Sequence, residues 1–248
     1  MVDAAEEVMP KSRERKSDRL METVHQGENR FVLVQAGPVN LEGSLYLAPN
    51  PKALIVFVHG SGSSHRSPRN QFLAEVFQKA GMMTLLFDLL TPEEEEVDIH
   101  TRHLRYDIGL LARRTIGAVD WLNQNADTHG LKLGFFGVST GAAAAFIAAA
   151  ERPEITGAIV SRGGRPDLAS AVLPLVKAPV LFITGELDSP ILELNKQAIA
   201  QMNPEARAEL QIVSGATHLF EEPKAMESVS ELATAWFQQH LSGDSGRT

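Results

Sequence analysis

LGFFGVSTGAAAAFIAAA, residues 133–150, combines a short apolar strand, a corner of small residues and an alanine-rich helix. The corner is GVSTG, in which Ser139 lies between Gly137 and Gly141. Where a strand turns sharply into a helix, the glycines leave room for the turn and the serine hydroxyl can be held exposed on a strained backbone. The corner therefore predicts a nucleophile. An ordinary strand-to-helix turn can have the same five residues. The choice between a nucleophile and an ordinary turn therefore depends on the rest of the chain.

Other apolar runs on both sides of this stretch predict a parallel sheet. Residues 53–59, ALIVFVH, form a continuous apolar run, which is typical of a strand buried on both faces. Alternating residues from position 30 onwards predict an antiparallel hairpin before it. We expect further strands at residues 82–87, 131–137, 156–161, 178–184 and 210–213, and helices at 72–80, 104–125, 190–201 and 222–240. This alternation predicts an α/β fold with about eight strands, mostly parallel, and helices on both faces.

Composition narrows the possible function classes. Hydrophobic residues make up 44% of the 248 residues and charged residues 22%, which is typical of a globular protein. A net charge of -8 argues against a nucleic-acid surface, which would need clustered Lys and Arg. The absence of cysteine excludes disulfides, thiolate metal sites and a cysteine nucleophile. Ser, His and carboxylate side chains must therefore supply the chemistry, and we expect a small-molecule partner.

The chain is expected to form one domain with short extensions. Residues 1–28 are predicted to be a charged arm, partly helical around residues 13–24, residues 29–242 a single α/β domain, and residues 243–248 a flexible tail. No signal peptide or spanning segment is indicated, so we expect a cytoplasmic protein without membrane contact. The acidic run at residues 93–98 is predicted to be a solvated loop, and no motif indicates an oligomeric state.

Candidate partners for Ser139 lie in the loops that follow other strands, where ligands bind in parallel sheets. Asp188 follows the strand at 178–184, and His218 follows the strand at 210–213. Each has a simpler explanation, because Asp188 could cap the next helix and His218 could be a hydrogen-bonded loop residue. All three nevertheless follow predicted strands, in the order Ser, Asp, His that α/β-hydrolase triads follow. The sequence therefore predicts a catalytic triad.

These landmarks carry a family resemblance over residues 41–241. The loop HGSGSS at 59–64, the corner GVSTG, GELD ending at Asp188 and GATHLF containing His218 resemble the α/β-hydrolase superfamily, and within it the dienelactone-hydrolase-like group. The resemblance implies an α/β-hydrolase fold. The segment of about 16 residues between the strands expected at 156–161 and 178–184 is too short for a large cap domain. The namesake enzymes use a cysteine nucleophile, whereas this chain has Ser139, so a serine esterase is the safer expectation.

The resemblance also suggests roles for individual residues. We expect acyl transfer to water, with His218 as base, Asp188 orienting it, and no metal or organic cofactor. The oxyanion would be bound by the backbone N–H of Thr140, the residue after the nucleophile, and by that of Ser61, as the resemblance implies. Glu186 is the competing acid, but the resemblance favours Asp188.

The sequence indicates less about the substrate than about the reaction. Arg162 and Arg165 lie on a short connection near the predicted site and could bind the carboxylate or phosphate of an anionic ester or lactone. Both could instead pair with local acids, and Asp167 lies two residues from Arg165. Two alternatives to hydrolysis stay open: acyl transfer or perhydrolysis with the same triad, and a pseudo-hydrolase that only binds a small molecule.

Overall fold

In a computed structural model, which describes residues 27–241, the chain folds around an eight-stranded sheet with the order β1-β2-β4-β3-β5-β6-β7-β8. The hairpin β1–β2 and the pair β2–β4 are antiparallel, and the other neighbours are parallel. This is the α/β-hydrolase fold that the sequence predicts. The strands are β1 (Glu28–Ala36), β2 (Val39–Leu47), β3 (Leu54–Val58), β4 (Met83–Phe87), β5 (Leu133–Val138), β6 (Thr156–Arg162), β7 (Val180–Gly185) and β8 (Ala208–Val213).

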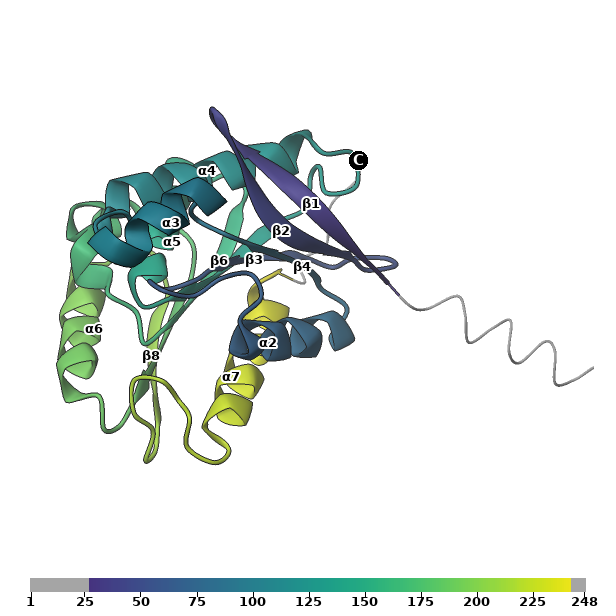
Figure 1. The fold of residues 1–248 in the computed structure, drawn as a ribbon. Coiled ribbons are helices and arrows are strands. Elements are labelled where there is room, and N and C mark those ends of the chain that lie inside the picture. Colours follow the sequence, from purple (N-terminus) through teal and green to yellow (C-terminus); the bar gives the residue numbers. More distant parts are fainter. Residues whose placement is uncertain (1–26, 242–248) are drawn as a thin grey trace, which may run out of the picture.

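Helices cover both faces of the sheet (Figure 1). The α-helices are α2 (Pro68–Lys79), α3 (Pro92–Thr101), α4 (Ile108–Gln124), α5 (Thr140–Glu151), α6 (Ser189–Gln201) and α7 (Ala225–Leu241), and the 3-10 helices are η1 (Leu104–Tyr106) and η2 (Pro166–Leu175). Helices α4, α5 and α6 pack on one face, and α2 and α7 on the other, so the hydrophobic core forms two clusters separated by the sheet.

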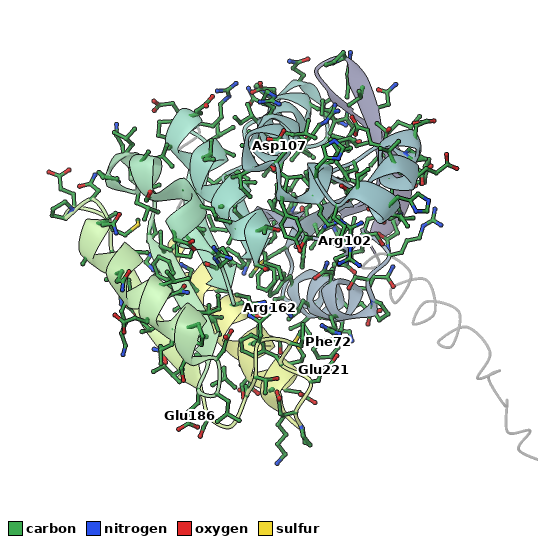
Figure 2. All side chains as sticks on the ribbon, turned by 60° about the vertical axis from the view of Figure 1, so that its left-hand side comes forward. Phe72, Arg102, Asp107, Arg162, Glu186 and Glu221 are labelled. Carbon is green, nitrogen blue, oxygen red and sulfur yellow. The ribbon has the colours of Figure 1, made fainter. Side chains whose placement is uncertain are left out.

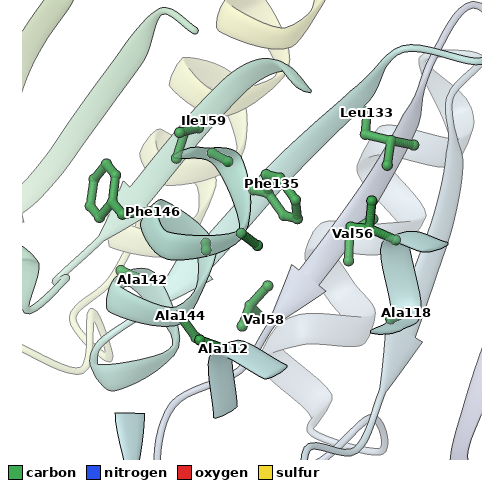
Figure 3. Packing of buried hydrophobic residues seen from close by; sticks show 14 of the residues in the cluster. Val56, Val58, Ala112, Ala118, Leu133, Phe135, Ala142, Ala144, Phe146 and Ile159 are labelled. Atoms are coloured by element: carbon green, nitrogen blue, oxygen red, sulfur yellow. The ribbon is translucent and has the colours of Figure 1, made fainter. Parts of the chain in front are cut away.

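Helix α5 lies at the centre of the larger cluster. Its small side chains, among them Ala142 and Ala144, let it approach β3 and β5 closely (Figure 3). Phe146 of this helix stacks on Phe182 of β7. Almost all of this helix is buried, which explains why its sequence is apolar on every side. The alanine run thus fixes the position of the corner that precedes it.

The corner between β5 and α5 has the strained backbone that its sequence predicts. Ser139 has φ 49° and ψ -121°, a conformation that side-chain-bearing residues rarely adopt. Two glycines allow it. A Cβ at Gly137 would press on the backbone of Ala142, and a Cβ at Gly141 would overlap the carbonyl oxygens of Val58 and His59.

Because of this contact, we expect Gly141→Ala to destabilise the protein by roughly 3 kcal/mol, through overpacking against rigid backbone. In a domain of this size the melting temperature should fall by roughly 6–12 °C, measurable by circular dichroism. Gly109→Ala in α4 is the control, because a Cβ there meets only the ends of the flexible Asp107 and Arg113 side chains. An unchanged melting temperature for Gly141→Ala would contradict the close packing of β3 on α5.

The acidic run at 93–98 is not the loop that the sequence predicts, because it forms helix α3. Thr91 and Glu94 form a reciprocal capping box, and Pro92 occupies the first turn. Acidic side chains in the first turn also interact favourably with the helix dipole. Arg114 of α4 binds Glu94 at 2.7 Å, so part of the charge is paired. Four consecutive glutamates therefore begin a helix here.

Other boundaries differ from expectation as well. The helix predicted at 104–125 is divided into η1 and α4 at Asp107, whose carboxylate accepts the Leu110 N–H and caps α4. Helix α2 begins at Pro68, one turn before the expected start. The predicted tail and nearly all of the charged arm lie outside the described residues. Within residues 27–241, no helix combines the length and apolarity needed to cross a bilayer.

Candidate active site

Ser139 lies in a cleft of about 1210 Å³ at the carboxyl ends of the parallel strands. The walls also contain Ser61, Thr140, Arg162, Arg165 and His218, so the cleft collects six of the seven residues that the sequence singles out. The seventh, Asp188, lies behind His218. The candidate residues thus gather at one site.

The Asp188 carboxylate contacts His218 directly. His218 Nδ1 lies 2.6 Å from Asp188 Oδ2, and the acid side chain is only 11% exposed. Asp188 occupies the N-cap position of α6, but its side chain makes no capping hydrogen bond. With a carboxylate on Nδ1, the proton belongs on that nitrogen, and Nε2 is left as a hydrogen-bond acceptor. No hydrogen bond joins Ser139 Oγ to the ring among the described residues, as is common for catalytic groups before substrate binds.

The two loops that carry Asp188 and His218 cross closely. A Cβ at Gly185 would overlap the carbonyl oxygens of Ala216 and Thr217, so only glycine permits this approach. Glu186 is directed away from the cleft, and Figure 2 shows it at the outer edge of the molecule. It accepts hydrogen bonds from Gly215 N–H and Ser214 Oγ, which hold the pKa of its carboxyl below the ordinary value. Glu186 braces the loop before His218 and does not contact the ring.

The segment after β6 holds the corner and the imidazole together. Ser139 N–H donates to the Arg162 carbonyl (3.3 Å), and Arg165 N–H donates to the Ser139 carbonyl (3.0 Å). Gly163, with φ +51°, lies under the His218 ring, where a Cβ would sit 3.4 Å from Cε1 and from Nδ1. This connection therefore contacts both Ser139 and His218.

A bulky residue at position 163 should displace the ring. We expect Gly163→Val to lower kcat about 10- to 100-fold for any ester that the protein hydrolyses, since misplacing a reacting group by about 1 Å can cost on the order of 100-fold. Gly130→Val is a matched control, because Gly130 also has positive φ (+78°) and nothing lies within 4 Å of its Cβ. Equal losses in both variants would show that backbone strain alone is responsible.

The expected oxyanion donors have different surroundings. Thr140 begins helix α5, so its N–H lies among the first amides, which have no partner within the helix. Ser61 N–H instead donates to Thr140 Oγ1 at 3.1 Å. A substrate oxygen would have to take the place of this hydroxyl or share the amide with it.

The sequence predicts no catalytic role for two histidines near the cleft. One of them, His59, is bound on both ring nitrogens by backbone groups. Its Nδ1 donates to the Gly60 carbonyl (2.9 Å) and its Nε2 accepts from Leu89 N–H (3.3 Å). Burial lowers the pKa of His59. Because Nε2 accepts the Leu89 N–H, it carries no proton in this arrangement, and the ring links the ends of β3 and β4.

The second histidine, His65, belongs to a cluster with Glu42 and Asp88, whose donor atoms lie within 4.8 Å of one another. Asp88 accepts His65 N–H and faces His65 Nδ1, both at 2.7 Å. Arg66 already places its guanidinium between Glu42 and His65, at 3.2 Å from each. A cation would have to displace this arginine, so the cluster is better described as an anchor for the loop at 60–66.

Arg162 and Arg165, paired in the sequence-based hypothesis, differ in the structure. Arg165 makes two hydrogen bonds to Asp167, at 2.8 and 2.7 Å. The guanidinium of Arg162 instead lies against the sulfur of Met226 and the ring of Phe220. The alternative of a local acid thus applies to Arg165.

Residues 41–241 match the model of the dienelactone hydrolase family. The chain belongs to that family. A dienelactone hydrolase from Anabaena variabilis, known from its crystal structure, is similar to it with 53% identity and a TM-score of 0.85, over 87% of this chain and 99% of that one. An esterase of Pyrococcus furiosus, 15% identical with a TM-score of 0.69 over 89% and 94% of the two chains, shares the fold.

A longer protein of Mycobacterium tuberculosis, named "Putative phosphoribosyl transferase", is similar to this chain. It is 50% identical over 212 residues, which are 86% of this chain and 46% of the relative. The chain thus spans about half the length of that protein.

Proposed function

We propose that the protein is a serine hydrolase that cleaves a carboxylic ester or lactone of a small molecule. The observation that carries this proposal is the contact of Asp188 with His218 Nδ1, beside a serine held in a strained strand-to-helix corner of the same cleft. Family membership supports hydrolysis in general, and the site supplies the reason for a serine nucleophile.

In the proposed reaction, His218 Nε2 accepts the hydroxyl proton of Ser139 as Oγ attacks the carbonyl carbon. Asp188 keeps the other ring nitrogen protonated and stabilises the imidazolium that forms. The Thr140 and Ser61 amides bind the developing oxyanion, each such donor being worth about 100- to 1000-fold in rate. His218 then protonates the leaving alcohol, and water hydrolyses the acyl-enzyme with the same groups. No step requires a metal or an organic cofactor.

The proposal is tested by incubating the protein with p-nitrophenyl esters of two to eight carbons and, separately, with a fluorophosphonate probe. Turnover together with labelling at Ser139 supports a serine hydrolase. A protein that is neither labelled nor active on any ester would instead be a binding protein. Adding an alcohol acceptor or hydrogen peroxide and analysing the products separates hydrolysis from acyl transfer and perhydrolysis.

The name of the Mycobacterium tuberculosis relative leads to no second proposal. It describes a protein of which the matched segment is only 46%. The loop after β3, HGSGSS, also lacks the spacing of the common nucleotide-phosphate loops. We therefore propose no transfer of a phosphoribosyl group for this chain.

A further inference from the structure

The glycine loop (residues 60–64) carries the N–H of Ser61, one of the two proposed oxyanion donors. Its first four residues form a β-turn, closed by the hydrogen bond from Ser63 N–H to the Gly60 carbonyl (3.2 Å). Gly62 is the third residue of this turn, and its φ of +72° is one that glycine adopts without strain. Because the turn moves as a unit, a contact that fixes Gly62 also fixes the orientation of the Ser61 N–H.

Arg105 of η1 contacts the turn at Gly62. A Cβ added to Gly62 would lie 3.3 Å from Arg105 Nη1, and apart from the adjoining residues no other described atom would lie within 4 Å of it. The Arg105 side chain is only 17% exposed, so the guanidinium is largely shielded from solvent. The turn is thus bounded on this side by a single side chain from a distant part of the sequence.

Asp98, near the end of α3, binds the other two nitrogens of this guanidinium. Its carboxylate accepts a hydrogen bond from Arg105 Nε, and its backbone carbonyl accepts one from Nη2 (3.3 Å). The same carboxylate accepts the backbone N–H groups of Leu104 (2.7 Å) and Arg105 (3.2 Å). With Nε and Nη2 bound to Asp98, Nη1 is the nitrogen that faces Gly62.

Burial of the Asp98–Arg105 pair argues for a role beyond stability. The Asp98 side chain is 0% exposed, whereas the side chains of Arg152 and Asp120, which pair at the far end of α5, are 34% and 43% exposed. Burial alone would raise the pKa of Asp98, but hydrogen bonds from Arg105 and from two backbone amides hold it below the ordinary value, so the carboxylate is charged at neutral pH. A buried ion pair is often no more stabilising than apolar residues of the same volume, so stability alone gives little reason for this one.

We propose that Arg105, held by Asp98, is a positioning residue for the proposed oxyanion site. Its Nη1 packs against Gly62 and keeps the Ser61 N–H beside Thr140 Oγ1, where the substrate oxygen becomes negative. This inference rests on the proposed function. Neither Asp98 nor Arg105 is among the described residues that line the cleft, so both act through the turn and not on the substrate. The acidic helix α3 thereby takes part in the proposed reaction.

Arg105→Met removes Nη1 and keeps an unbranched apolar side chain in its place. For p-nitrophenyl acetate we expect kcat to fall about 10- to 100-fold while KM changes by less than about threefold, because a displaced oxyanion donor loses part of the roughly 100- to 1000-fold that it contributes to the transition state. A trifluoromethyl ketone forms an adduct with the serine that carries the oxyanion, so its inhibition constant should rise by the factor by which kcat/KM falls. An unchanged kcat would overturn the proposal.

Arg105→Lys separates positioning of the turn from the ion pair. The ammonium group can still pair with Asp98, but its single nitrogen cannot also contact Gly62. The melting temperature should therefore stay within about 4 °C of the wild type, while kcat falls about as far as in Arg105→Met. A lysine variant with the wild-type kcat would contradict the role of Nη1, because the charge alone would then suffice.

Two further variants complete the set. Asp98→Asn places an amide donor against Arg105 Nε and so releases the guanidinium. We expect a loss of kcat similar to that of Arg105→Met, and no further loss in the double variant, since residues that act as a unit are not additive. Arg152→Met is the matched control, because it breaks an Arg–Asp pair at the opposite end of α5 from the corner, and its kcat should equal that of the wild type. Multiplying losses in the double variant would refute the coupling.

Amide hydrogen exchange, followed by NMR, distinguishes failure of this inference from failure of the proposed function. In Arg105→Met the Ser61 and Ser63 amides should exchange roughly 10-fold faster than in the wild type, and in Arg152→Met at the wild-type rate. Faster exchange in a protein that turns over no ester would support the hold of Arg105 on the turn and refute the hydrolase. Turnover of esters, with exchange and kcat both unchanged in Arg105→Met, would retain the hydrolase and refute the positioning role.

Discussion

Ser139→Ala should lower kcat for an ester substrate by roughly 10⁵- to 10⁶-fold, the loss that follows removal of the nucleophile from a serine triad. In the proposed reaction the effect is large because Ser139 alone forms the acyl-enzyme, whereas residual catalysis by the proposed oxyanion site would remain. The change removes one oxygen from a partly exposed position and leaves the strained backbone in place. The melting temperature should therefore change little. Stopped assays with p-nitrophenyl acetate and mass spectrometry after fluorophosphonate treatment measure both consequences.

Ser63→Ala is the matched control for this experiment. Ser63 lines the same cleft, and its backbone N–H donates to the Gly60 carbonyl, a bond that alanine keeps. The variant should be labelled and active like the wild type. If Ser139→Ala were still labelled at wild-type rate, the probe would be reacting elsewhere and the nucleophile would be misassigned.

Asp188→Asn should lower kcat about 10⁴-fold with little change in KM, as the corresponding substitution does in serine proteases. The asparagine amide would donate to His218 Nδ1, so that the proton moves to Nε2 and the ring can no longer accept one from Ser139. Because the acid is only 11% exposed and lies 2.6 Å from His218 Nδ1, water cannot readily take the place of the carboxylate. The loss should persist across pH 6–9, because it arises from the wrong tautomer.

Glu186→Gln serves as the comparison. Its amide oxygen can still accept the Gly215 N–H, and the side chain is exposed, so we expect a loss of less than about fivefold. If Glu186→Gln abolished turnover while Asp188→Asn did not, the acid would be Glu186, and the loop geometry around His218 would need another explanation.

The fold was largely predictable because its signals are local. Continuous apolar runs indicated the buried parallel strands, and the small-residue corner indicated the turn that follows β5. The acidic helix α3 was missed because the run of four glutamates was interpreted as a solvated loop, whereas Thr91, Pro92 and Glu94 together carry the start signal for a helix. The break at Asp107 likewise depends on a side-chain cap that the spacing of apolar residues does not reveal.

The sequence indicated which residues gather in the candidate site, but not the contacts that they make there. The order of Ser139, Asp188 and His218 indicated which side chains to compare, since all follow parallel strands. The difference between Arg162 and Arg165 depends on burial and on pairs distant in sequence, such as Arg69 with Glu221, 152 positions apart. A single sequence offers no signal for such pairs.

The hydrogen bond from Ser61 N–H to Thr140 Oγ1 affects how strongly the site binds the transition state compared with the substrate. In the proposed reaction, a neutral carbonyl oxygen entering the site exchanges one neutral acceptor for another and gains little. An oxygen that has become negative gains much more from the same amide, because charge-assisted hydrogen bonds are about twice as strong. Displacing the threonine hydroxyl would cost the same in both states, so the net gain at this amide would be small for the neutral substrate and large for the charged transition state.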